Sequence, residues 1–488
     1  MEHYLAVDIG ASSGRVLLST LNDGKMSLTE IHRFKNGFSF RDGHDRWAIE
    51  ELVTNIIKGL ELAKEQYGVE SCTLGIDTWA VDYCLIDKEG NLLADPIAYR
   101  DARTEYAVEK VSQEISLDEL YERTGIQIQP FNTLFQLFVE DKTLLDKADK
   151  IALIPDYLGY RLTGNLVTEK TNASTTQLLN PGTLTWDVKL MQILGIDTSY
   201  FAPLVDAGNI LGKLAKDQFP ANDLPETTVI TVATHDTASA VLGTPSNSTD
   251  NWAYLSSGTW SLLGVETKVA RVSRKAFFEN YTNEWGAHNT IRFLKNIMGM
   301  WLVQEVARMQ NYQISYAEMA ELAAKEPAFQ QWIDINDQRF LNPENMIQEI
   351  QSYCRETNQT VPTSPGAIAR CIYDNLALCY AVELEKLEAI TGVEDIIDTL
   401  YIVGGGSNNT FLNQLTADVA NIRVQAGPGE ATAIGNLALQ MITVGDCSSI
   451  EEARKIIKAS FPCTEYHPRE NQSTVLTNYK KFLKMRNY

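Results

Sequence analysis

The sequence predicts an α/β protein built of two domains. The chain has 488 residues, more than one hydrophobic core usually organises. Apolar strands end in aspartates at Asp8, Asp77 and Asp236, next to turns or helix starts. A strand, a turn of small residues and a second strand open the chain and recur near residue 253. The repetition lies in the order of elements and not in the residues themselves.

The first half opens with an antiparallel meander. Strands are predicted over residues 4–8, 15–21 and 25–34 because apolar runs alternate there with turns such as Asn22-Asp23-Gly24. An amphipathic pattern from Asp45 predicts a helix that Gly68 ends. The further elements expected in this half are strands over 72–77, 81–86 and 151–154, and helices over 117–124, 132–146 and 157–162.

A polar, turn-rich stretch over residues 243–251 is typical of a crossover between domains. The elements predicted after it are strands over 253–256, 260–265, 399–403 and 422–424, and helices over 297–309, 316–324, 365–391, 410–419 and 431–443. We therefore expect domains over 1–244 and 252–445. Residues 446–488 are predicted to form a helical tail that packs on the second domain.

The charge of the chain restricts its partners. The formal net charge is -21, so a nucleic acid or an anionic membrane surface is an improbable partner, whereas a small anion can still bind in a local positive site. Seven scattered cysteines without a C-x-x-C pair argue against a zinc site and against a disulfide scaffold. Neither a signal sequence nor an apolar stretch long enough for a membrane span is evident, so we expect a cytoplasmic protein.

The stretch over residues 228–240 reads TVITVATHDTASA and combines a buried strand with a helix start. Open α/β proteins place their chemistry where a strand ends and a helix begins, so Asp236 is a candidate catalytic carboxylate. The alternative is that Asp236 only caps the helix. This segment by itself does not decide between the two.

Three turns of small residues follow strands, over residues 10–14, 256–259 and 404–409. Small residues let backbone N–H groups and hydroxyls approach a phosphate closely, although each turn alone could be an ordinary turn. A Walker A loop is absent, and residues 208–213 come nearest to one. Residues 10–14 match G-x-S-x-G, but a strand follows where a nucleophile elbow needs a helix.

The motifs together resemble a known family. DIGASSGR from Asp8 and YLSSGTWSLLG from Tyr254 look like the two phosphate motifs of the ATPase fold of actin, hexokinase and the heat-shock chaperones, and VGGGSNN from Val403 looks like its adenosine motif. Within this fold the chain resembles the FGGY carbohydrate kinases. The motifs that carry the likeness are IDTWAVDY, YRDART, IPDYLGYRLTG, TNASTTQLLN, THDTASAV and LKNIMGMWLVQ, which span nearly the whole chain in order. They look more like the family's L-rhamnulose kinases than its xylulose, fuculose or glycerol kinases.

The resemblance implies two ribonuclease-H-like (actin-like ATPase) domains, with mixed central sheets flanked by helices and a cleft between them. It implies transfer of the ATP γ-phosphate to O1 of L-rhamnulose with Mg²⁺. By position, Asp236 matches the family's catalytic base. The residues that match its ATP-binding positions are Ala11, Ser12, Ser13, Gly14, Arg15, Thr259, Gln304 and Gly405. Those that match its sugar-binding positions are Ala80, His235, Asp236, Thr237 and Asn296.

The chemistry of these residue types agrees with that assignment. Asp236 can accept the proton of a sugar hydroxyl, and Asp8 can hold Mg²⁺ directly or through water. Alternatives stay open for two positions: Asn296 could cap the helix predicted over 297–309, and His235 could be an ordinary core histidine. Other readings of the chain are a different FGGY ketose kinase, a non-catalytic sugar- or nucleotide-binding protein of the same fold, and an actin-like ATPase module. We expect a monomer or a weak homo-oligomer.

Ala80 departs from the L-rhamnulose kinases that this chain resembles, whereas two of its cysteines match them. Ala80 stands where a glycine is expected, and its methyl group could crowd the sugar. The resemblance also implies that Cys354 and Cys371 match a disulfide of those kinases. In a reducing cytosol both thiols are expected to be free most of the time.

Overall fold

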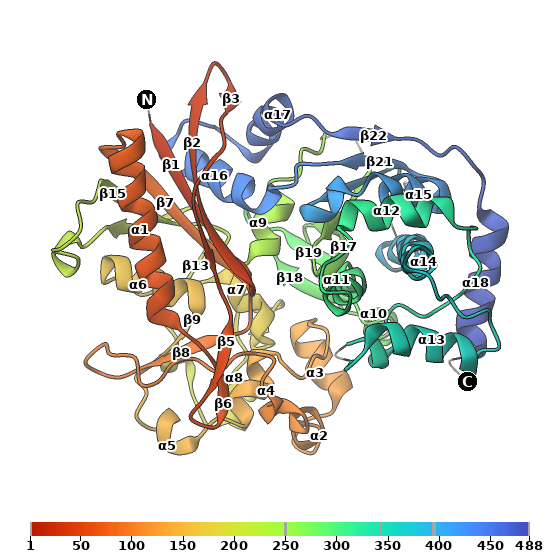
Figure 1. Ribbon diagram of the computed structural model, residues 1–488. Coiled ribbons are helices and arrows are strands. Elements are labelled where there is room, and N and C mark those ends of the chain that lie inside the picture. The colour runs from red at the N-terminus through yellow and green to blue at the C-terminus, as the bar shows by residue number, and fades with distance from the viewer. Residues whose placement is uncertain (1, 248–250, 342, 393–396, 487–488) are drawn as a thin grey trace. The chain divides into compact units, whose positions relative to one another are not determined.

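The structure, a computed structural model, describes residues 2–247, 251–341, 343–392 and 397–486. The chain forms two compact units of α/β structure, coloured along the sequence in Figure 1. The first unit comprises Met1–Pro245, Glu266–Phe293 and Ala431–Ser460, and the second comprises Ser246–Val265, Leu294–Glu430 and Phe461–Tyr488. The crossover predicted over 243–251 lies partly outside the described residues. The predicted α/β class is confirmed.

The first unit is built on a mixed sheet with strand order β14-β15-β7-β1-β2-β3, and β4 pairs with β2. Its strands are β1 (His3–Ile9), β2 (Ser13–Asn22), β3 (Lys25–Met26), β4 (Thr29–Lys35), β7 (Ser71–Thr78), β14 (Asn209–Lys213) and β15 (Glu226–Thr231). Strands β1, β2 and β4 run antiparallel in succession, which confirms the predicted meander. Strands β1, β7 and β15 are parallel, so their carboxyl ends meet at one edge of the sheet.

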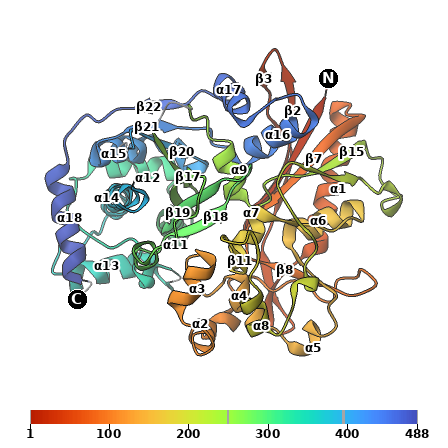
Figure 2. The ribbon, with the colours of Figure 1, turned by 180° about the vertical axis from the view of Figure 1, so that it is seen from behind.

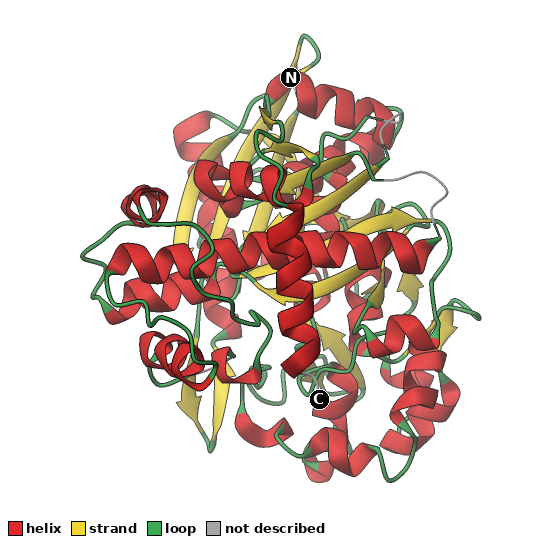
Figure 3. Cartoon of the chain, turned by 90° about the vertical axis from the view of Figure 1, so that its right-hand side faces the viewer, coloured by secondary structure: helices red, strands yellow, loops and turns green. Residues whose placement is uncertain are grey.

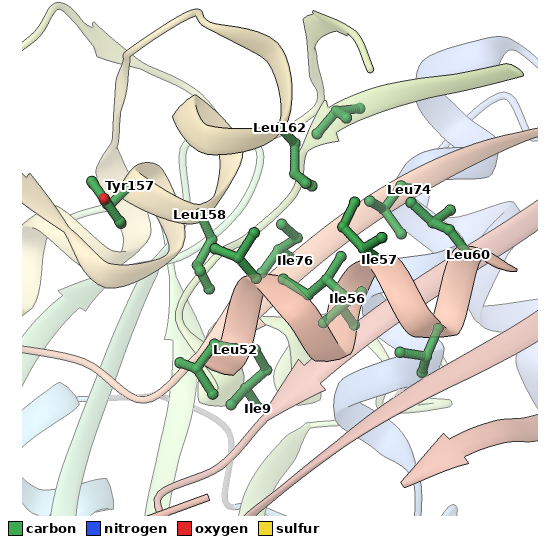
Figure 4. Close-up of a cluster of buried hydrophobic side chains, with 14 of the residues drawn as sticks. Ile9, Leu52, Ile56, Ile57, Leu60, Leu74, Ile76, Tyr157, Leu158 and Leu162 are labelled. Carbon is green, nitrogen blue, oxygen red and sulfur yellow. The ribbon is translucent and has the colours of Figure 1, made fainter. Parts of the chain in front are cut away.

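Helix α1 (Ile49–Tyr67) covers one face of this sheet. Figure 4 shows Leu52, Ile56 and Leu60 of α1 among apolar side chains of the sheet and of α6 (Ile154–Thr163). Burying one such side chain stabilises the fold by about 1.5–3 kcal/mol relative to leaving it in water. The helix begins four residues later than predicted because His44–Trp47 form β6, which pairs with β5 (Phe38–Arg41).

Smaller elements of the first unit surround this core. The remaining helices are α2 (Ala107–Val111), α3 (Leu117–Thr124), α4 (Thr133–Phe138), α5 (Lys142–Leu145), α7 (Lys170–Ala173), α8 (Val188–Leu194), α9 (Asp236–Leu242), α10 (Arg274–Phe278), α16 (Ala431–Val444) and α17 (Ile450–Ser460). The remaining strands are β8 (Tyr83–Ile86), β9 (Lys150–Leu153), β10 (Thr168–Glu169), β11 (Leu179–Asn180), β12 (Thr185–Trp186), β13 (Leu204–Val205) and β18 (Thr282–Trp285). The helix predicted over 132–146 is two helices, because Asp141 caps a new start by accepting from the Thr143 N–H.

Helices α9 and α16 pack closely in the first unit, as Figure 2 shows from behind. A Cβ atom on Gly435 would lie 1.8 Å from the Ser239 carbonyl oxygen, so the two backbones touch only because this residue is glycine. Helix α16 also hydrogen-bonds to the sheet. Gln440 donates to the Leu5 carbonyl at 2.8 Å and accepts from the Thr73 hydroxyl at 2.6 Å.

The predicted packing of the tail needs a correction. Residues 446–488 do not lie wholly on the second domain, because α17 belongs to the first unit and the Met26 N–H donates to Ser460 at 2.8 Å. Helix α18 (Ser473–Arg486) belongs to the second unit, where it packs against α14 (Pro365–Thr391). Figure 3 shows α18 ending at the C label. The domain boundaries expected at residues 244, 252 and 445 stay predictions.

The second unit repeats the topology of the first. The part of its seven-stranded sheet that lies in this unit has the strand order β19-β17-β16-β20-β21-β22. Strands β16 and β17 are antiparallel, whereas β16, β20 and β21 run parallel. The strands are β16 (Trp252–Ser257), β17 (Trp260–Thr267), β19 (Ile291–Met298), β20 (Thr399–Val403), β21 (Arg423–Ala426) and β22 (Thr464–Tyr466). The other helices are α11 (Trp301–Met309), α12 (Tyr316–Lys325), α13 (Met346–Glu356) and α15 (Thr410–Ala420).

The helix predicted over residues 297–309 is wrong at its start. Residues Ile291–Met298 form strand β19, and α11 begins only at Trp301. A Cβ atom on Gly299 would lie 2.7 Å from the Ser261 nitrogen, so the chain turns in close contact with β17 before the helix starts. Among the described residues, no helix is long and apolar enough to cross a membrane.

Candidate active site

The turn after β1 is the first of the predicted phosphate turns. It consists of Gly10, Ala11 and Ser12, and the Gly10 N–H donates to the Ser13 carbonyl at 2.9 Å. Asn36 fixes the turn from outside, because its side chain donates to the Gly10 carbonyl at 2.8 Å. Ser13, Gly14 and Arg15 already belong to β2, where they pair with β4. The turn is therefore shorter than predicted.

Asp8 and Arg15 face each other across the hairpin of β1 and β2. The guanidinium of Arg15 donates to the Asp8 carboxylate at 2.6 Å, and both side chains are largely buried. A charge-assisted bond of this kind is stronger than a neutral one. The candidate Mg²⁺ ligand and a candidate ATP-binding residue are thus partners in this structure.

Asp236 is the first residue of α9, and a third of its side-chain surface is exposed. The Thr237 N–H and hydroxyl donate to Asp236 Oδ1 at 2.5 Å and 3.1 Å. Burial, with a further contribution from the nearby Asp8 carboxylate, raises the pKa of Asp236 to about 6. The N-cap position belongs to His235, so Asp236 does not act as the helix cap.

Asp77, at the end of β7, completes a group of three strand-end carboxylates with Asp8 and Asp236. It is fully buried and accepts from the Asn436 amide of α16 at 2.7 Å. Burial, and then the neighbouring Asp8 and Asp236, raise the pKa of Asp77 well above its usual value. The parallel strands therefore concentrate acidic groups at one edge of the sheet.

The strand end before Asp236 is held by a buried carboxylate that the sequence did not reveal. Glu169 accepts from the Thr234 N–H at 3.1 Å and from the Thr234 hydroxyl at 2.8 Å. It also accepts from the Thr171 N–H and caps α7. Glu169 thus fixes the backbone immediately before His235 and Asp236. An N-cap glutamate is uncommon, so no sequence rule singled it out.

His235 lies among charged side chains of β18 and β19. Arg292 Nη2 lies 2.9 Å from His235 Nδ1 and 3.1 Å from a Glu284 carboxylate oxygen. Burial, assisted by the Arg292 charge, holds the pKa of His235 well below its usual value. Neither Arg292 nor Glu284 was predicted as a site residue. An arginine in the apolar run IRFLKN was the available signal.

Ala80 lies in the turn between β7 and β8, beside a strained residue. Val81 has a φ of 67°, a conformation that β-branched residues rarely adopt. The Val81 carbonyl accepts from the Thr133 hydroxyl at 2.6 Å, and the buried Asp82 carboxylate accepts from the indoles of Trp47 and Trp79 at 2.7 Å and 2.9 Å. These bonds hold the turn that presents Ala80.

In the second unit, two predicted nucleotide residues are brought together. The Thr259 hydroxyl donates to the Gln304 side chain at 3.2 Å. The turn between β16 and β17 also meets the start of α11, since the Trp301 N–H donates to the Thr259 carbonyl at 3.0 Å. Gly405 begins a short 3-10 helix, η6 (Gly405–Asn408), that follows β20, and a Cβ atom there would meet nothing within 4 Å.

Asn296 lies inside strand β19 and not at a helix start. The capping alternative considered for this residue is therefore wrong, because α11 begins five residues later with Met300 at its N-cap. Its proposed contact with a sugar stays a prediction. Cys354 and Cys371 are both free and buried in the second unit.

The arrangement of the first unit suits proton transfer and phosphate binding. It offers a carboxylate with a pKa near 6, a guanidinium, and a turn of small residues at neighbouring strand ends. The second unit offers hydroxyl, amide and glycine groups, which suit a nucleotide.

Comparisons with known proteins agree with this chemistry. The model of the FGGY family of carbohydrate kinases, N-terminal domain, matches residues 3–243, and that of the C-terminal domain matches residues 253–444. A rhamnulokinase of Enterococcus faecalis is 62% identical over 99% of this chain and 97% of its own length. A rhamnulokinase of Bacillus subtilis is 52% identical over 98% of both chains.

Solved structures show the same fold. A glycerol kinase of Plasmodium falciparum, solved with ADP, superposes with a TM-score of 0.80 at 17% identity, over 100% of this chain and 98% of that one. A ligand-bound xylulose kinase of Lactobacillus acidophilus gives 0.77 at 15% identity, over 100% and 98% of the two chains. At such identities the likeness concerns the fold alone.

Proposed function

Since the chain belongs to the FGGY family of carbohydrate kinases, we propose that it transfers the γ-phosphate of ATP to O1 of L-rhamnulose in L-rhamnose catabolism. The observation that carries this proposal is the high identity, over nearly the whole chain, to relatives described as rhamnulokinases. ATP is the co-substrate. The residue roles below rest on the geometry within each unit.

Asp236 is the proposed general base. Its carboxylate lies at a strand end, is partly exposed, and is ionised above a pKa of about 6. It can therefore accept the proton of the O1 hydroxyl near neutral pH as that oxygen attacks phosphorus. Ala80, His235, Thr237 and Asn296 are proposed to contact the sugar hydroxyls, which need both donors and acceptors.

Each unit by itself carries proposed nucleotide-binding residues. Ala11 and Ser12 of the turn are proposed to supply backbone N–H groups to the phosphates, Ser13 its hydroxyl and Arg15 its guanidinium, and Gly14 is proposed to line the same site. Thr259, Gln304 and Gly405 are the proposed contacts in the second unit. Arg15 would exchange the Asp8 carboxylate for a phosphate oxygen when ATP binds.

Asp8 fits the role of a Mg²⁺ ligand, because this ion takes one or two carboxylates and keeps waters and phosphate oxygens as its other ligands. When bound, Mg²⁺ would neutralise charge on the phosphates. Release of Arg15 from Asp8 would leave the carboxylate available to the ion. We also propose a cytoplasmic location, where ATP is present, and a monomer or a weak homo-oligomer.

A panel of ketoses in a coupled ADP-release assay tests the proposal. The panel contains L-rhamnulose, L-fuculose, D-xylulose and, as a non-ketose control, glycerol. The highest kcat/KM is expected with L-rhamnulose. A higher value with another ketose would reassign the substrate within the family. Absence of turnover on every acceptor, in protein that still binds ATP, would instead support a non-catalytic binding protein.

A further inference from the structure

A buried charged pair lies against His235, the residue immediately before the proposed base. Arg292 of β19 has no exposed side-chain surface, and the side chains of Glu284 of β18 and His235 are each 9% exposed. All three belong to the first unit. Arg292 is further fixed by its Nε, which donates to the Trp285 carbonyl at 3.3 Å. Burying a charged pair is costly, so its position beside the site needs an explanation.

The contact between Arg292 and His235 determines where the imidazole proton lies. A guanidinium has only donors, so the 2.9 Å contact from Arg292 Nη2 requires a lone pair on His235 Nδ1. A neutral imidazole carries one proton, which must then sit on Nε2. His235 Nε2 lies 3.3 Å from Asp236 Oδ1. The nitrogen that carries the ring proton therefore lies beside the carboxylate of the proposed base.

We propose that Arg292 is a positioning residue that fixes the Nε2–H tautomer of His235 and, through it, orients Asp236 for proton acceptance. The catalytic part of this inference rests on the proposed kinase function, whereas the tautomer does not. Among the described residues, the Thr237 N–H and hydroxyl donate to Asp236 Oδ1, His235 Nε2 lies 3.3 Å from the same oxygen, and Oδ2 accepts no hydrogen bond. Oδ2 is then the oxygen that takes the proton of the sugar hydroxyl.

Glu284 could stabilise the other tautomer of His235, in which Nδ1 carries the proton. One of its carboxylate oxygens lies 3.4 Å from His235 Nδ1, so a proton on Nδ1 could be donated to Glu284 instead. Arg292 prevents this by pairing with the same oxygen at 3.1 Å and by donating to Nδ1 itself. The ion pair also offsets the arginine charge. Burial and Arg292 hold the pKa of His235 well below its usual value, which keeps the ring neutral at pH 7.

The charged groups that face these two side chains come from several elements. Asp236 is influenced by Asp8 of β1, Asp77 of β7 and Arg292 of β19, and it contacts His235. His235 is faced by Glu284, Arg292 and Asp236. Loss of the donor on Nε2 would leave the Asp236 carboxylate less stabilised against its acidic neighbours, so its pKa would rise.

The tautomer can be measured directly. Nitrogen-15 NMR of the full-length protein labelled in its histidine rings distinguishes a protonated Nε2 from a protonated Nδ1. The chain has six histidines, and a His235→Gln variant assigns the signal by its absence. We expect a neutral ring with the proton on Nε2 at pH 7.5, without any substrate. A proton on Nδ1, or a charged ring, would overturn the proposal while leaving the kinase assignment untouched.

Variants then test the role of Arg292. For Arg292→Met we expect a proton shift to Nδ1, a fall in kcat of about 10²-fold, as misplacement of a reacting group can cost, and a smaller change in KM. The acid limb of the kcat profile should move up by roughly half a pH unit, because the polar contact of the Nε2–H group with Asp236 is lost. Arg292→Lys, which keeps a donor, should recover part of the loss.

Two further variants keep the outcome interpretable. Glu284→Gln removes the competing acceptor charge and should leave the proton on Nε2, even if Arg292→Met fails to fold. Arg370→Met removes another buried arginine, paired with Asp374 at 2.7 Å in the second unit, and should lose stability without a change in kcat. An unchanged tautomer and an unchanged acid limb in Arg292→Met would refute the proposal. An equal fall in kcat for Arg370→Met would show that loss of a buried charge alone accounts for the effect.

Discussion

The strand ends of the two units differ far more than the strands themselves. In each unit a hairpin, β1–β2 or β16–β17, is extended by two parallel strands, β7–β15 or β20–β21. The first unit places Asp8, Asp77 and Asp236 at its strand ends. The second places hydroxyls and glycines there, such as Ser257, Gly404 and Gly427.

This difference suits the same topology to two kinds of ligand. Carboxylates next to one another raise each other's pKa, which suits proton transfer and cation binding. Glycines and hydroxyls add no charge and admit a bulky anion or a ring close to the backbone. The apolar strands that carry these residues have the same order and direction in both units. Substitutions at the strand ends should therefore alter chemistry in the first unit and nucleotide affinity or packing in the second.

The largest effect is expected from Asp236→Asn. Turnover should fall by at least about 10²-fold, because the amide cannot accept the proton, while ATP and sugar binding change little. Coupled ADP release and calorimetric titration measure the two quantities. Asp374→Asn is the matched control in the second unit, since burial also raises the pKa of Asp374 to about 6. Near-normal turnover of Asp236→Asn would remove this residue from the mechanism.

The pH profile of kcat should depend on Asp236 of the first unit and not on Asp374 of the second unit. Because the base acts when ionised and burial raises the pKa of Asp236 to about 6, kcat should fall by about tenfold per pH unit below that value. Above about pH 7 the ionised form dominates and this limb is flat. Asp374→Asn should leave the limb in place. A profile that stays flat down to pH 5 would contradict the assignment of the base.

Two neighbouring glycines, Gly405 and Gly406, test how tightly the chain is packed after β20 in the second unit. In Gly406→Ala the new Cβ would lie 2.0 Å from the Ser257 hydroxyl, so overpacking should cost about 1–3 kcal/mol and lower Tm. Gly405→Ala adds a Cβ into open space and should leave Tm unchanged while raising the KM for ATP. Thermal unfolding and steady-state kinetics compare the pair. Equal losses of Tm in both variants would contradict this division of roles.

The smallest effect is expected from Thr259→Ala. Loss of the 3.2 Å bond to Gln304 and of one hydroxyl should raise the KM for ATP by about fivefold, the worth of about one hydrogen bond, with kcat for L-rhamnulose nearly constant. Thr259→Ser keeps the hydroxyl and serves as the control. A large fall in kcat with an unchanged KM for ATP would place Thr259 in the chemical step instead.

Much of the fold follows from local patterns in the sequence. The long helix predicted over 365–391 is α14, and the structure shows that Ser364 caps its start, that Pro365 fits its first turn and that Gly392 ends it. The strand over Thr399–Val403 was equally clear as an apolar run before glycines. The start of β19 was missed because Met298, Leu302 and Val306 are spaced four residues apart, as on one face of a helix, whereas long-range pairing makes residues 291–298 a strand.

The site was predictable only where a residue type is unusual for its position. Asp236 stood out as a carboxylate at a strand end, and Thr259 and Gln304, assigned through the resemblance, do lie together. Glu169 and Glu284 could not be found in this way, because a glutamate in a polar stretch ordinarily faces solvent. Their importance depends on burial and on distant partners: Thr234 for Glu169, and His235 for Glu284.

The glycine contact between α9 and α16 has a consequence for the biosynthesis of the protein. The first unit cannot close until residues 431–460 have left the ribosome, because Asn436 and Gln440 supply partners to Asp77 and to the Leu5 carbonyl. At the usual elongation rates of about 5–20 residues per second, β1 and β7 would wait roughly 20–80 s for α16. A ribosome-bound chain stopped before residue 431 should thus remain protease-sensitive in its first 245 residues, and a nascent chain of this enzyme would depend on chaperones until its last helices emerge.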